Sequence, residues 1–437
     1  MKNRILKKAI NLKDPHLREM LIGSIIGLGI KVLAAISIFV MNIAVARTLG
    51  AAEAGLFFLG FTLATMAAAI GRVGLDQTIV RFVAAQKATN SIGMLHGVYR
   101  KSIIWVSLAS TGLAYLGWIN INWLIKHLFD QPGFEPVLRS FLLAIPLIAL
   151  YTMQAQARQE LRKIAKSMIT LNVIVPAALL LMMLLSPVTS ATTLVGYFNI
   201  ACLLTLGIGA VLWIQSAPLK TFKESFPSDL LRKTCMPLWA VAVLSQVVQW
   251  SSQLMLGAWS TSEEVAFFAT AQRTAMLTSF VLFAVNAIAA PKFAAMYAKG
   301  DHDGLKRLAI ISVRLMLLAA VPALALMLLF PEWLMSFFGE EFRVASTALV
   351  ILALGQFVNI ATGSVGYLLS MTGLERKVRD NAFLSALIGV TLGFVLIPSY
   401  GLLGASVATA IAIASQNLLG VYQVRKHLGF NTLVFWQ

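Results

Sequence analysis

Four basic residues lie inside long apolar segments of this chain, and no aspartate or glutamate lies inside those segments. The four are Lys31, Arg72, Arg273 and Arg314. A charged side chain in the hydrocarbon of a bilayer is costly unless it faces a cavity, a water path or a partner. Because the apolar segments supply no carboxylate to pair with these cations, we predict that they bind an anion from outside the protein. The chemistry that they indicate is transport of a negatively charged molecule.

Arg273 and Lys31 lie deepest in their segments. Arg273 is about nine residues into an apolar span at 265–290, which is roughly 13 Å of helix, and polar Gln272 precedes it. Lys31 is about ten residues into a span at 21–46, in a glycine-rich stretch. We expect both to face a cavity. The alternatives are that either one binds backbone carbonyls, or that Arg273 extends toward the membrane surface.

Arg72 and Arg314 are shallower candidates for the same anion. Arg72 lies near the end of a span at 54–74 and four residues before Asp76, a spacing at which the two side chains can pair on a helix. Arg314 lies about two turns into a span at 308–331. For both residues the alternative to substrate contact is that the long side chain extends to the membrane surface.

Uncharged amide side chains in the spans form a second set of candidate ligands. Each amide offers a donor and an acceptor, which suits the hydroxyl groups of a sugar. The same groups equally suit hydrogen bonds between transmembrane helices, so both interpretations stay open here. The candidates are Gln249, Gln272, Asn286, Gln356 and Asn359.

The composition is typical of an integral membrane protein. Of 437 residues, 59% are hydrophobic and 12% are charged, whereas soluble domains carry about 25% charged residues. Apolar stretches long enough to cross a bilayer recur throughout, so we predict an all-α membrane protein with about 12 transmembrane helices. The first stretch is too long for a signal peptide and is expected to be retained. The predicted spans are 21–46, 54–74, 102–119, 138–153, 168–186, 191–215, 236–258, 265–290, 308–331, 346–370, 381–398 and 401–424.

Several functional classes are disfavoured by the residues that the chain has. Cys202 and Cys235 lack metal-ligand spacing and the five histidines lie in predicted loops or tails, so we expect no metal or other cofactor. The net charge of +17 comes from short basic loops between spans, which set membrane orientation and contact anionic lipid head groups, rather than from a nucleic-acid-binding surface. The sequence contains neither a nucleophile paired with a base nor a glycine-rich phosphate loop, so nothing in it indicates an enzyme.

The basic residues also predict the orientation. Outside the spans, 27 Lys and Arg fall on the side of the termini and 4 on the other side. Positively charged loops stay in the cytoplasm, so both termini are expected there. The predicted organisation is a tail at 1–20, an N-lobe of six spans at 21–215, a linker at 216–235, a C-lobe of six spans at 236–424 and a tail at 425–437.

A weak internal repeat supports two lobes whose helices cross the membrane in the same order and direction. When residues 53–87 are placed over 264–298, Glu53 falls on Glu264 and Phe57 on Phe268, and the pair Arg81-Phe82 falls on Lys292-Phe293. Parallel repeats are related by an axis along the membrane normal, and transporters built in this way hold the substrate between the halves.

Three segments resemble the polysaccharide biosynthesis transport family, in the right order and spacing. They are ARTLGAAEAGLFFLGFTLATMAAAIGRVGLDQTIVRFVA (46–84), GYLLSMTGLERKVRDN (366–381) and LIPSYGLLGASVATAIAIASQNLLGVYQVRKHLG (396–429). This resemblance to Wzx-type flippases of the MOP superfamily implies a V-shaped bundle of two six-helix lobes around a cationic central cavity. It also implies movement of a polyprenyl-pyrophosphate-linked oligosaccharide from the cytoplasmic to the outer leaflet, for O-antigen, lipopolysaccharide or another surface glycan. Many relatives carry an acid in the seventh span, where this chain has Ser252-Gln253.

The resemblance further implies a bacterial inner-membrane location and membrane lipids as partners. A polysaccharide polymerase or glycosyltransferases are further candidate partners, and a monomer is expected. The alternative function is a MATE-like exporter of cationic drugs, which predicts a membrane-embedded acid. An absence of acids beside four bases argues against that alternative.

Overall fold

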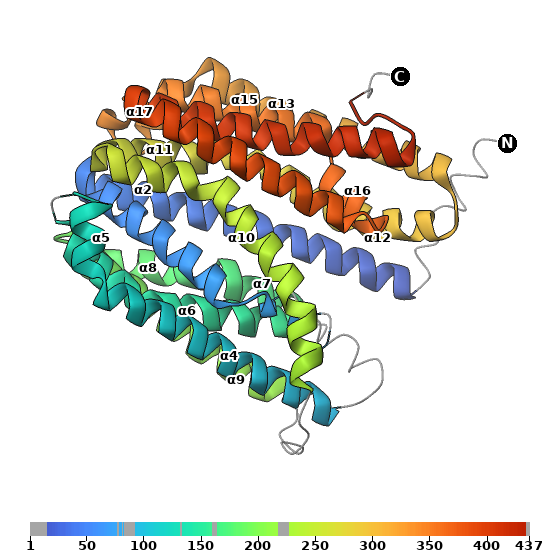
Figure 1. Ribbon diagram of the computed structural model, residues 1–437, viewed down its shortest axis with the longest axis horizontal. Coiled ribbons are helices and arrows are strands. Elements are labelled where there is room, and N and C mark those ends of the chain that lie inside the picture. The colour runs from blue at the N-terminus through green and yellow to red at the C-terminus, as the bar shows by residue number, and fades with distance from the viewer. Residues whose placement is uncertain are drawn as a thin grey trace.

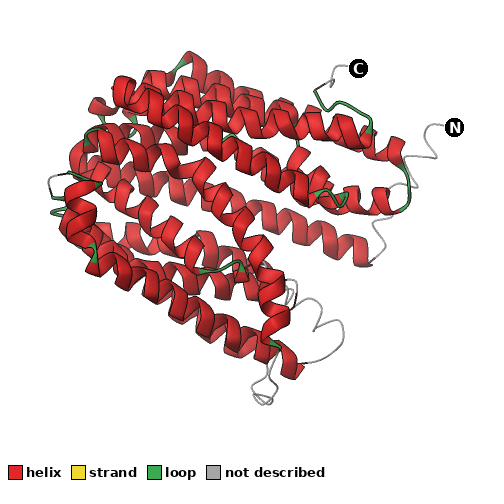
Figure 2. Ribbon diagram, viewed as in Figure 1, coloured by secondary structure: helices red, strands yellow, loops and turns green. Residues whose placement is uncertain are grey.

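The computed structural model describes residues 15–76, 78–80, 82, 92–131, 133–159, 164–216 and 227–433. Nearly all of these residues are helical, and the described ranges contain no strand (Figure 2). Within them, eight helical segments are long and apolar enough to cross a membrane. The predicted all-α membrane class is therefore confirmed, while the number of twelve spans stays a prediction.

The helices follow the predicted spans closely but extend beyond several of them. In the first half of the chain they are α2 (Pro15–Gly71), α4 (Ile92–Ile119), α5 (Ile121–His127), α6 (Phe134–Gln159), α7 (Ile164–Asn172), α8 (Ile174–Leu185) and α9 (Ala191–Ser216). In the second half they are α10 (Ser228–Trp259), α11 (Ser262–Met276), α12 (Ser279–Ala298), α13 (His302–Leu329), α14 (Pro331–Ser336), the 3₁₀ helix η1 (Glu340–Ala345), α15 (Ser346–Thr362), α16 (Val365–Met371) and α17 (Glu375–Leu428). Residues 228–235 of the predicted linker are thus part of α10, and 425–428 of the predicted tail are part of α17.

Glycines mark the points where long apolar segments bend. Gly50 in α2 and Gly401 in α17 have positive φ angles of 70° and 49°, a region that favours glycine because it has no Cβ. Each of these two helices therefore consists of two halves that correspond to two predicted spans. The predicted span 346–370 is broken at Gly363, where φ is 75° and a Cβ would lie 2.3 Å from a methyl group of Val313.

The helices form two bundles that diverge toward the end where both chain termini lie (Figure 1). We call α2 and α4–α9 the N-terminal bundle and α10–α17 the C-terminal bundle. The second half of α2 packs against α11 and α10 as well as against α6, so it connects the two bundles. The arrangement agrees with the predicted lobes, whose boundaries remain predictions.

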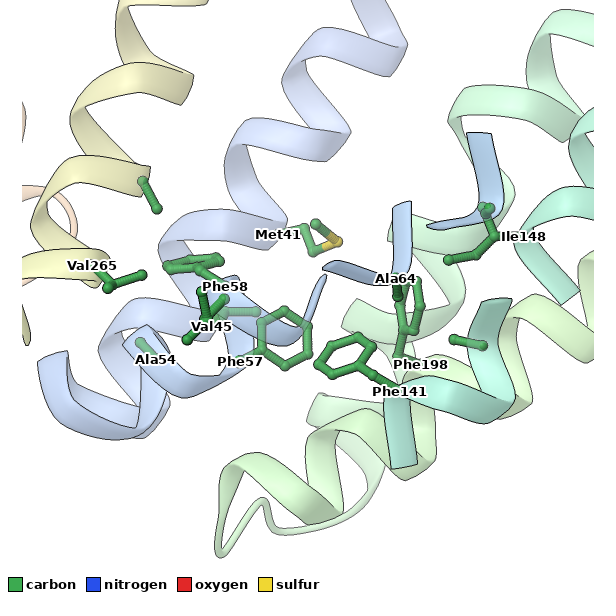
Figure 3. Packing of buried hydrophobic residues seen from close by; sticks show 14 of the residues in the cluster. Met41, Val45, Ala54, Phe57, Phe58, Ala64, Phe141, Ile148, Phe198 and Val265 are labelled. Atoms are coloured by element: carbon green, nitrogen blue, oxygen red, sulfur yellow. The ribbon is translucent and has the colours of Figure 1, made fainter. Parts of the chain in front are cut away.

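Neighbouring phenylalanines of α2 explain how one helix serves both bundles. Phe57 points toward the N-terminal bundle, where its ring lies 5.4 Å from that of Phe141 and 6.4 Å from that of Phe198. Phe58 points toward α11 and its residue Val265 (Figure 3). Successive residues of an α-helix are about 100° apart, so adjacent large side chains reach different faces. Both phenylalanines are almost fully buried.

Two glutamates give the internal repeat a physical form. Glu53 accepts a hydrogen bond from the backbone N–H of Ala191, at 2.7 Å, where α9 begins. Glu264 accepts one from the N–H of Leu402, at 3.1 Å, where the second half of α17 begins. The numbers 264 minus 53 and 402 minus 191 are both 211, so the same contact occurs once in each bundle. Arg81 of the predicted repeat lies outside the described residues.

Replacing Glu53 or Glu264 with Ala should lower the melting temperature of the purified protein in detergent. Each substitution removes a carboxylate that accepts a helix-terminal N–H, a loss of roughly 1–2 kcal/mol. Glu263→Ala is the matched control, since Glu263 is exposed. Equal melting temperatures for all three variants would contradict the assigned role.

Candidate functional site

Arg273 lies where α11 meets α2 and α10, and its guanidinium is enclosed by aromatic rings. Its Cζ atom lies 4.3 Å from the centre of the Phe58 ring, 5.7 Å from that of Phe61 and 5.9 Å from that of Trp250. The Nη1 and Nη2 atoms are buried and have no hydrogen-bond partner among the described residues. Arg273 therefore lies in the protein interior, and no acid of the described residues pairs with it; that it faces a cavity stays a prediction.

The residues beside Arg273 connect it to α10. Gln272 donates a hydrogen bond to the backbone carbonyl of Gln249, at 2.7 Å, and the Gln249 amide donates to the sulfur of Met276, at 3.0 Å. Trp250 follows Gln249 directly and faces the Arg273 guanidinium. Consecutive residues of α10 thus face Arg273 on one side and Met276 on the other.

A cavity of about 500 Å³ lies on that second side, inside the C-terminal bundle. It is bounded by α10, α12, α15, α16, α17 and the end of α11, and it reaches the break between α15 and α16. Tyr367, glycines and apolar side chains such as Met276 supply the rest of the wall, apart from ten amide and aliphatic hydroxyl residues. Ten amide and hydroxyl side chains line it: Ser245, Gln249, Ser279, Asn286, Gln356, Asn359, Ser364, Asn381, Gln416 and Asn417. We call this space the amide cavity.

Part of the polar lining is hydrogen-bonded internally. Gln356 accepts hydrogen bonds through Oε1 from Ser279, at 2.9 Å, and from Asn359, at 3.1 Å. Ser364 donates to Asn286 across the break between α15 and α16. These bonds hold the amides of α12 and α15 in fixed positions, as a preorganised polar site requires.

The amide cavity holds some of the predicted site residues and not others, while the central cationic cavity stays a prediction. Four predicted residues line it, namely Gln249, Asn286, Gln356 and Asn359, and Gln272 supports Gln249 from behind. None of the four predicted cations lines it, and the described lining contains no charged side chain. Sequence position alone could not separate the amide face of these helices from the face that carries Arg273.

Arg72 has a partner that the sequence analysis placed outside the membrane. Its Nε lies 2.9 Å from Oδ2 of Asp76, and the two side chains are only 14% and 11% exposed. The chain turns after α2 ends at Gly71, and this turn brings Asp76 back into the interior. The expectation that Arg72 lacks a carboxylate is therefore wrong.

Lys31 and Arg314 lie apart from the amide cavity. Lys31 is half-buried on the first half of α2, which runs between the two bundles (Figure 1). Arg314 is exposed on α13 together with Ile311, Leu315 and Leu318. An exposed face of large aliphatic residues is typical of a lipid-facing surface, so the geometry favours the alternative in which Arg314 extends toward the membrane surface.

The structure also places residues that the sequence analysis overlooked. Arg158, assigned to a basic loop, is 1% exposed near the end of α6, and its Nη atoms have no partner among the described residues. Asn381, Gln416 and Asn417 line the amide cavity. The sequence could have identified these three, because they are amide residues within predicted apolar spans, like Gln356 and Asn359, which were predicted.

At the end opposite the termini, hydrogen bonds join the two bundles. The Arg47 Nε donates to the carbonyl of Phe337, at 2.7 Å, and the N–H of Ala51 donates to Oε1 of Glu341, at 2.8 Å. In the same direction, from the N-terminal to the C-terminal bundle, the Gln131 amide donates to the carbonyl of Gly257, at 3.2 Å. We call these three contacts the seam bonds. They hold the bundles together at the end where the helices converge.

Comparison with known proteins places this arrangement in a family. The model of the family described as polysaccharide biosynthesis protein matches residues 21–297, more than half of the chain. The chain belongs to this family. The MatE family model matches residues 237–395. Both matches include α11, and therefore Arg273.

The family assignment agrees with individual relatives. The chain is 28% identical over 174 residues to the probable low-salt glycan biosynthesis flippase Agl15 of Haloferax volcanii, a match that spans 39% of this chain and 36% of that protein. Among solved structures, an inward-facing MATE multidrug transporter of the MOP superfamily superimposes with a TM-score of 0.78 at 14% identity, covering 93% of this chain and 98% of that one. The lipid II flippase MurJ in an inward closed conformation gives 0.74 at 14% identity, covering 93% and 87%. This family member therefore has the MOP-superfamily fold.

Among the residues that the structure describes, no group of three His, Cys, Asp or Glu side chains could hold a metal ion. The chemistry of this family member at the site must then be argued from Arg273 and the amides. They offer a ligand charge and hydrogen bonds.

Asp76→Ala should destabilise the purified protein by roughly 3 kcal/mol, because it leaves the buried Arg72 guanidinium without its partner. Glu135→Ala is the matched control. Its pair with Arg139 has the same spacing of four residues but is 38% and 44% exposed, so the loss should stay below about 1 kcal/mol. Thermal unfolding in detergent measures both, and equal losses would show that Arg72 does not depend on Asp76.

Proposed function

We propose that this protein is a flippase that moves an anionic, polyprenyl-pyrophosphate-linked oligosaccharide across the membrane by alternating access. Movement runs from the cytoplasmic to the outer leaflet and supplies a surface polysaccharide such as an O-antigen. Membership of the polysaccharide biosynthesis protein family supports this proposal, as does the name of the Haloferax volcanii relative. The observation that carries it is the Arg273 guanidinium, which is buried without an acid.

A diphosphate is the anion that suits Arg273 best. The guanidinium presents its N–H donors in a planar fork that matches phosphate oxygens in a bidentate manner. In Arg273 the rings of Phe58 and Trp250 contact the guanidinium, and such contacts leave its in-plane donors available. Its Nη atoms have no other partner in the described ranges. An incoming diphosphate would therefore satisfy donors that the protein leaves unsatisfied.

Alternating access requires the two bundles to separate at one end and then at the other. The seam bonds hold them together opposite the termini, while the helices diverge on the side of the termini (Figure 1). In this proposal the substrate enters from the side of the termini, for which the distribution of basic loops supports a cytoplasmic location; there α10 still bonds the N-terminal bundle, through Lys101 to Ser228 and through Trp239 to the carbonyl of Ile70. Release to the outer leaflet would then require the seam bonds to break.

The remaining proposals concern the protein's setting. We propose a location in a bacterial cytoplasmic membrane, with both termini inside, and a monomer as the working unit. Membrane lipids surround it, and a polysaccharide polymerase or glycosyltransferases would act before or after it on the same glycolipid. The amide cavity has no acid among its described lining residues that could bind a cation, which supports the flippase over the alternative of a cation exporter.

Arg273→Ala should abolish surface glycan display in a host that depends on this protein, because the diphosphate would lose its charged partner. Arg273→Lys should restore part of the display, since a lysine keeps the charge but loses the bidentate fork. Glycan display is measured by immunoblot of cell-surface polysaccharide, with the amount of protein in the membrane measured in parallel.

Arg314→Leu is the matched control for that experiment. It also removes an arginine from an apolar helix, but at an exposed position on α13, so display should stay near the wild-type level. Normal display by Arg273→Ala would refute the assigned role of Arg273. Loss of display in Arg314→Leu alone would assign the anion to the face of α13 that carries Arg314.

Covalent closure of the seam should stop transport. Cysteines introduced by Ala51→Cys and Glu341→Cys, in a Cys202→Ala and Cys235→Ala background, would be joined by a short cleavable linker. We expect glycan export in inverted vesicles to stop after linking and to recover after the linker is cleaved. Export that continues at the unlinked rate would exclude separation of the bundles at this end.

A further inference from the structure

We infer that the amide cavity binds the first sugar of the carried lipid, the one attached to the diphosphate, and that it selects an uncharged sugar. This inference rests on the proposed function, since it assumes that Arg273 holds the diphosphate. It adds a second recognition site with a different chemistry. The argument depends on hydrogen-bonding groups that the cavity leaves unused, on the absence of charge and on the position of the cavity.

The amide cavity has more hydrogen-bonding groups than its own contacts satisfy. The side chains of Asn381 and Gln416 line it and have no hydrogen-bond partner among the described residues. Asn359 donates to Gln356, which leaves its own carbonyl oxygen facing the cavity without a partner in the described chain. Polar groups that face a cavity and are not used within the protein can hydrogen-bond a ligand, so a ligand that supplies hydroxyl or acetamido groups would be bound in preference to an apolar one.

The lack of charge in the lining restricts which sugar can bind. A uronic acid would bring a carboxylate, and an unmodified amino sugar would bring an ammonium group. The described lining residues offer neither a cation nor an anion to pair with them. Moving an unpaired charge out of water is far more costly than moving a hydroxyl that is hydrogen-bonded. A neutral hexose or an N-acetylated hexosamine therefore fits, and a charged sugar does not.

The position of the cavity identifies which sugar of the glycan it can reach. Gln249 faces the cavity while its neighbour Trp250 contacts the Arg273 guanidinium. On α11, Met276 lines the cavity and lies three residues, less than one helical turn, after Arg273. The two sites are therefore adjacent. A volume of about 500 Å³ is that of a small-molecule site rather than of a long glycan, so the sugar next to the diphosphate is the one that fits.

Binding of three short-chain probes to the purified protein in detergent tests the inference. The probes are citronellyl diphosphate alone, the same diphosphate esterified to an N-acetylhexosamine, and the same diphosphate esterified to a hexuronic acid. We expect the neutral sugar to tighten binding roughly tenfold over the bare diphosphate, and the acidic sugar to give no gain. Isothermal titration calorimetry measures all three dissociation constants.

Substitutions then locate the gain. Asn381→Leu, alone and with Asn359→Leu, should remove the gain from the neutral sugar and leave the affinity for bare diphosphate unchanged, which also shows that the variants are folded. Asn381→Leu breaks no hydrogen bond within the described protein. Gln246→Ala, one turn earlier on α10 than Gln249 and outside the described lining, should retain the gain. Arg273→Gln should weaken all three probes.

The outcomes separate this inference from the proposed function. A gain that persists in the double variant, or an equal gain from the acidic sugar, would overturn the inference and leave the flippase proposal intact. Wild-type protein that binds bare diphosphate but shows no gain from the neutral sugar would do the same. Failure of wild-type protein to bind any of the three diphosphates would refute the proposed function, and the inference with it.

Discussion

The burial of the Arg273 guanidinium without a carboxylate is the constraint on which the site depends. Removing an ion from water costs several kcal/mol even after the protein relaxes, and stacking on an aromatic ring returns about 2 kcal/mol at best. Phe58 supplies such a ring at 4.3 Å, so the compensation within the described protein is incomplete. We expect a bound anion to supply the remaining stabilisation of this buried positive charge.

The second half of α2 contributes the aromatic ring that contacts Arg273, because it places aromatic side chains in both bundles. Phe57 packs against Phe141 and Phe198 (Figure 3), and Phe58 lies against Arg273. Gln253 of α10 donates to the carbonyl of Phe58, at 3.0 Å, and ties the same turn to the C-terminal bundle. A motion of the bundles relative to each other must therefore change the surroundings of Arg273. Breaking or forming the seam bonds should therefore change how accessible the Arg273 guanidinium is.

The sequence predicted the fold well because hydrophobic length and charge bias are properties of continuous segments. It also predicted the pair Glu53 and Glu264, whose carboxylates bind equivalent helix starts 211 residues apart. It failed where the chain turns back on itself. Asp76 follows a turn after α2 and reaches Arg72, and Arg158 is buried because α6 continues past the predicted end of its span. Neither event leaves a trace in a linear pattern of hydropathy.

At the candidate site, too, folding separates residues that the linear sequence grouped together. The sequence separated the four cations only by depth, whereas in the structure Asp76 neutralises Arg72, and Arg314 lies on an exposed aliphatic face. A transporter must bind its cargo weakly enough to release it, and fewer cations at the site favour release. One buried arginine beside an uncharged amide cavity divides recognition between two moderate interactions. A motion that draws Phe58 away from Arg273 would weaken the site enough for release without the need to break several ion pairs at once.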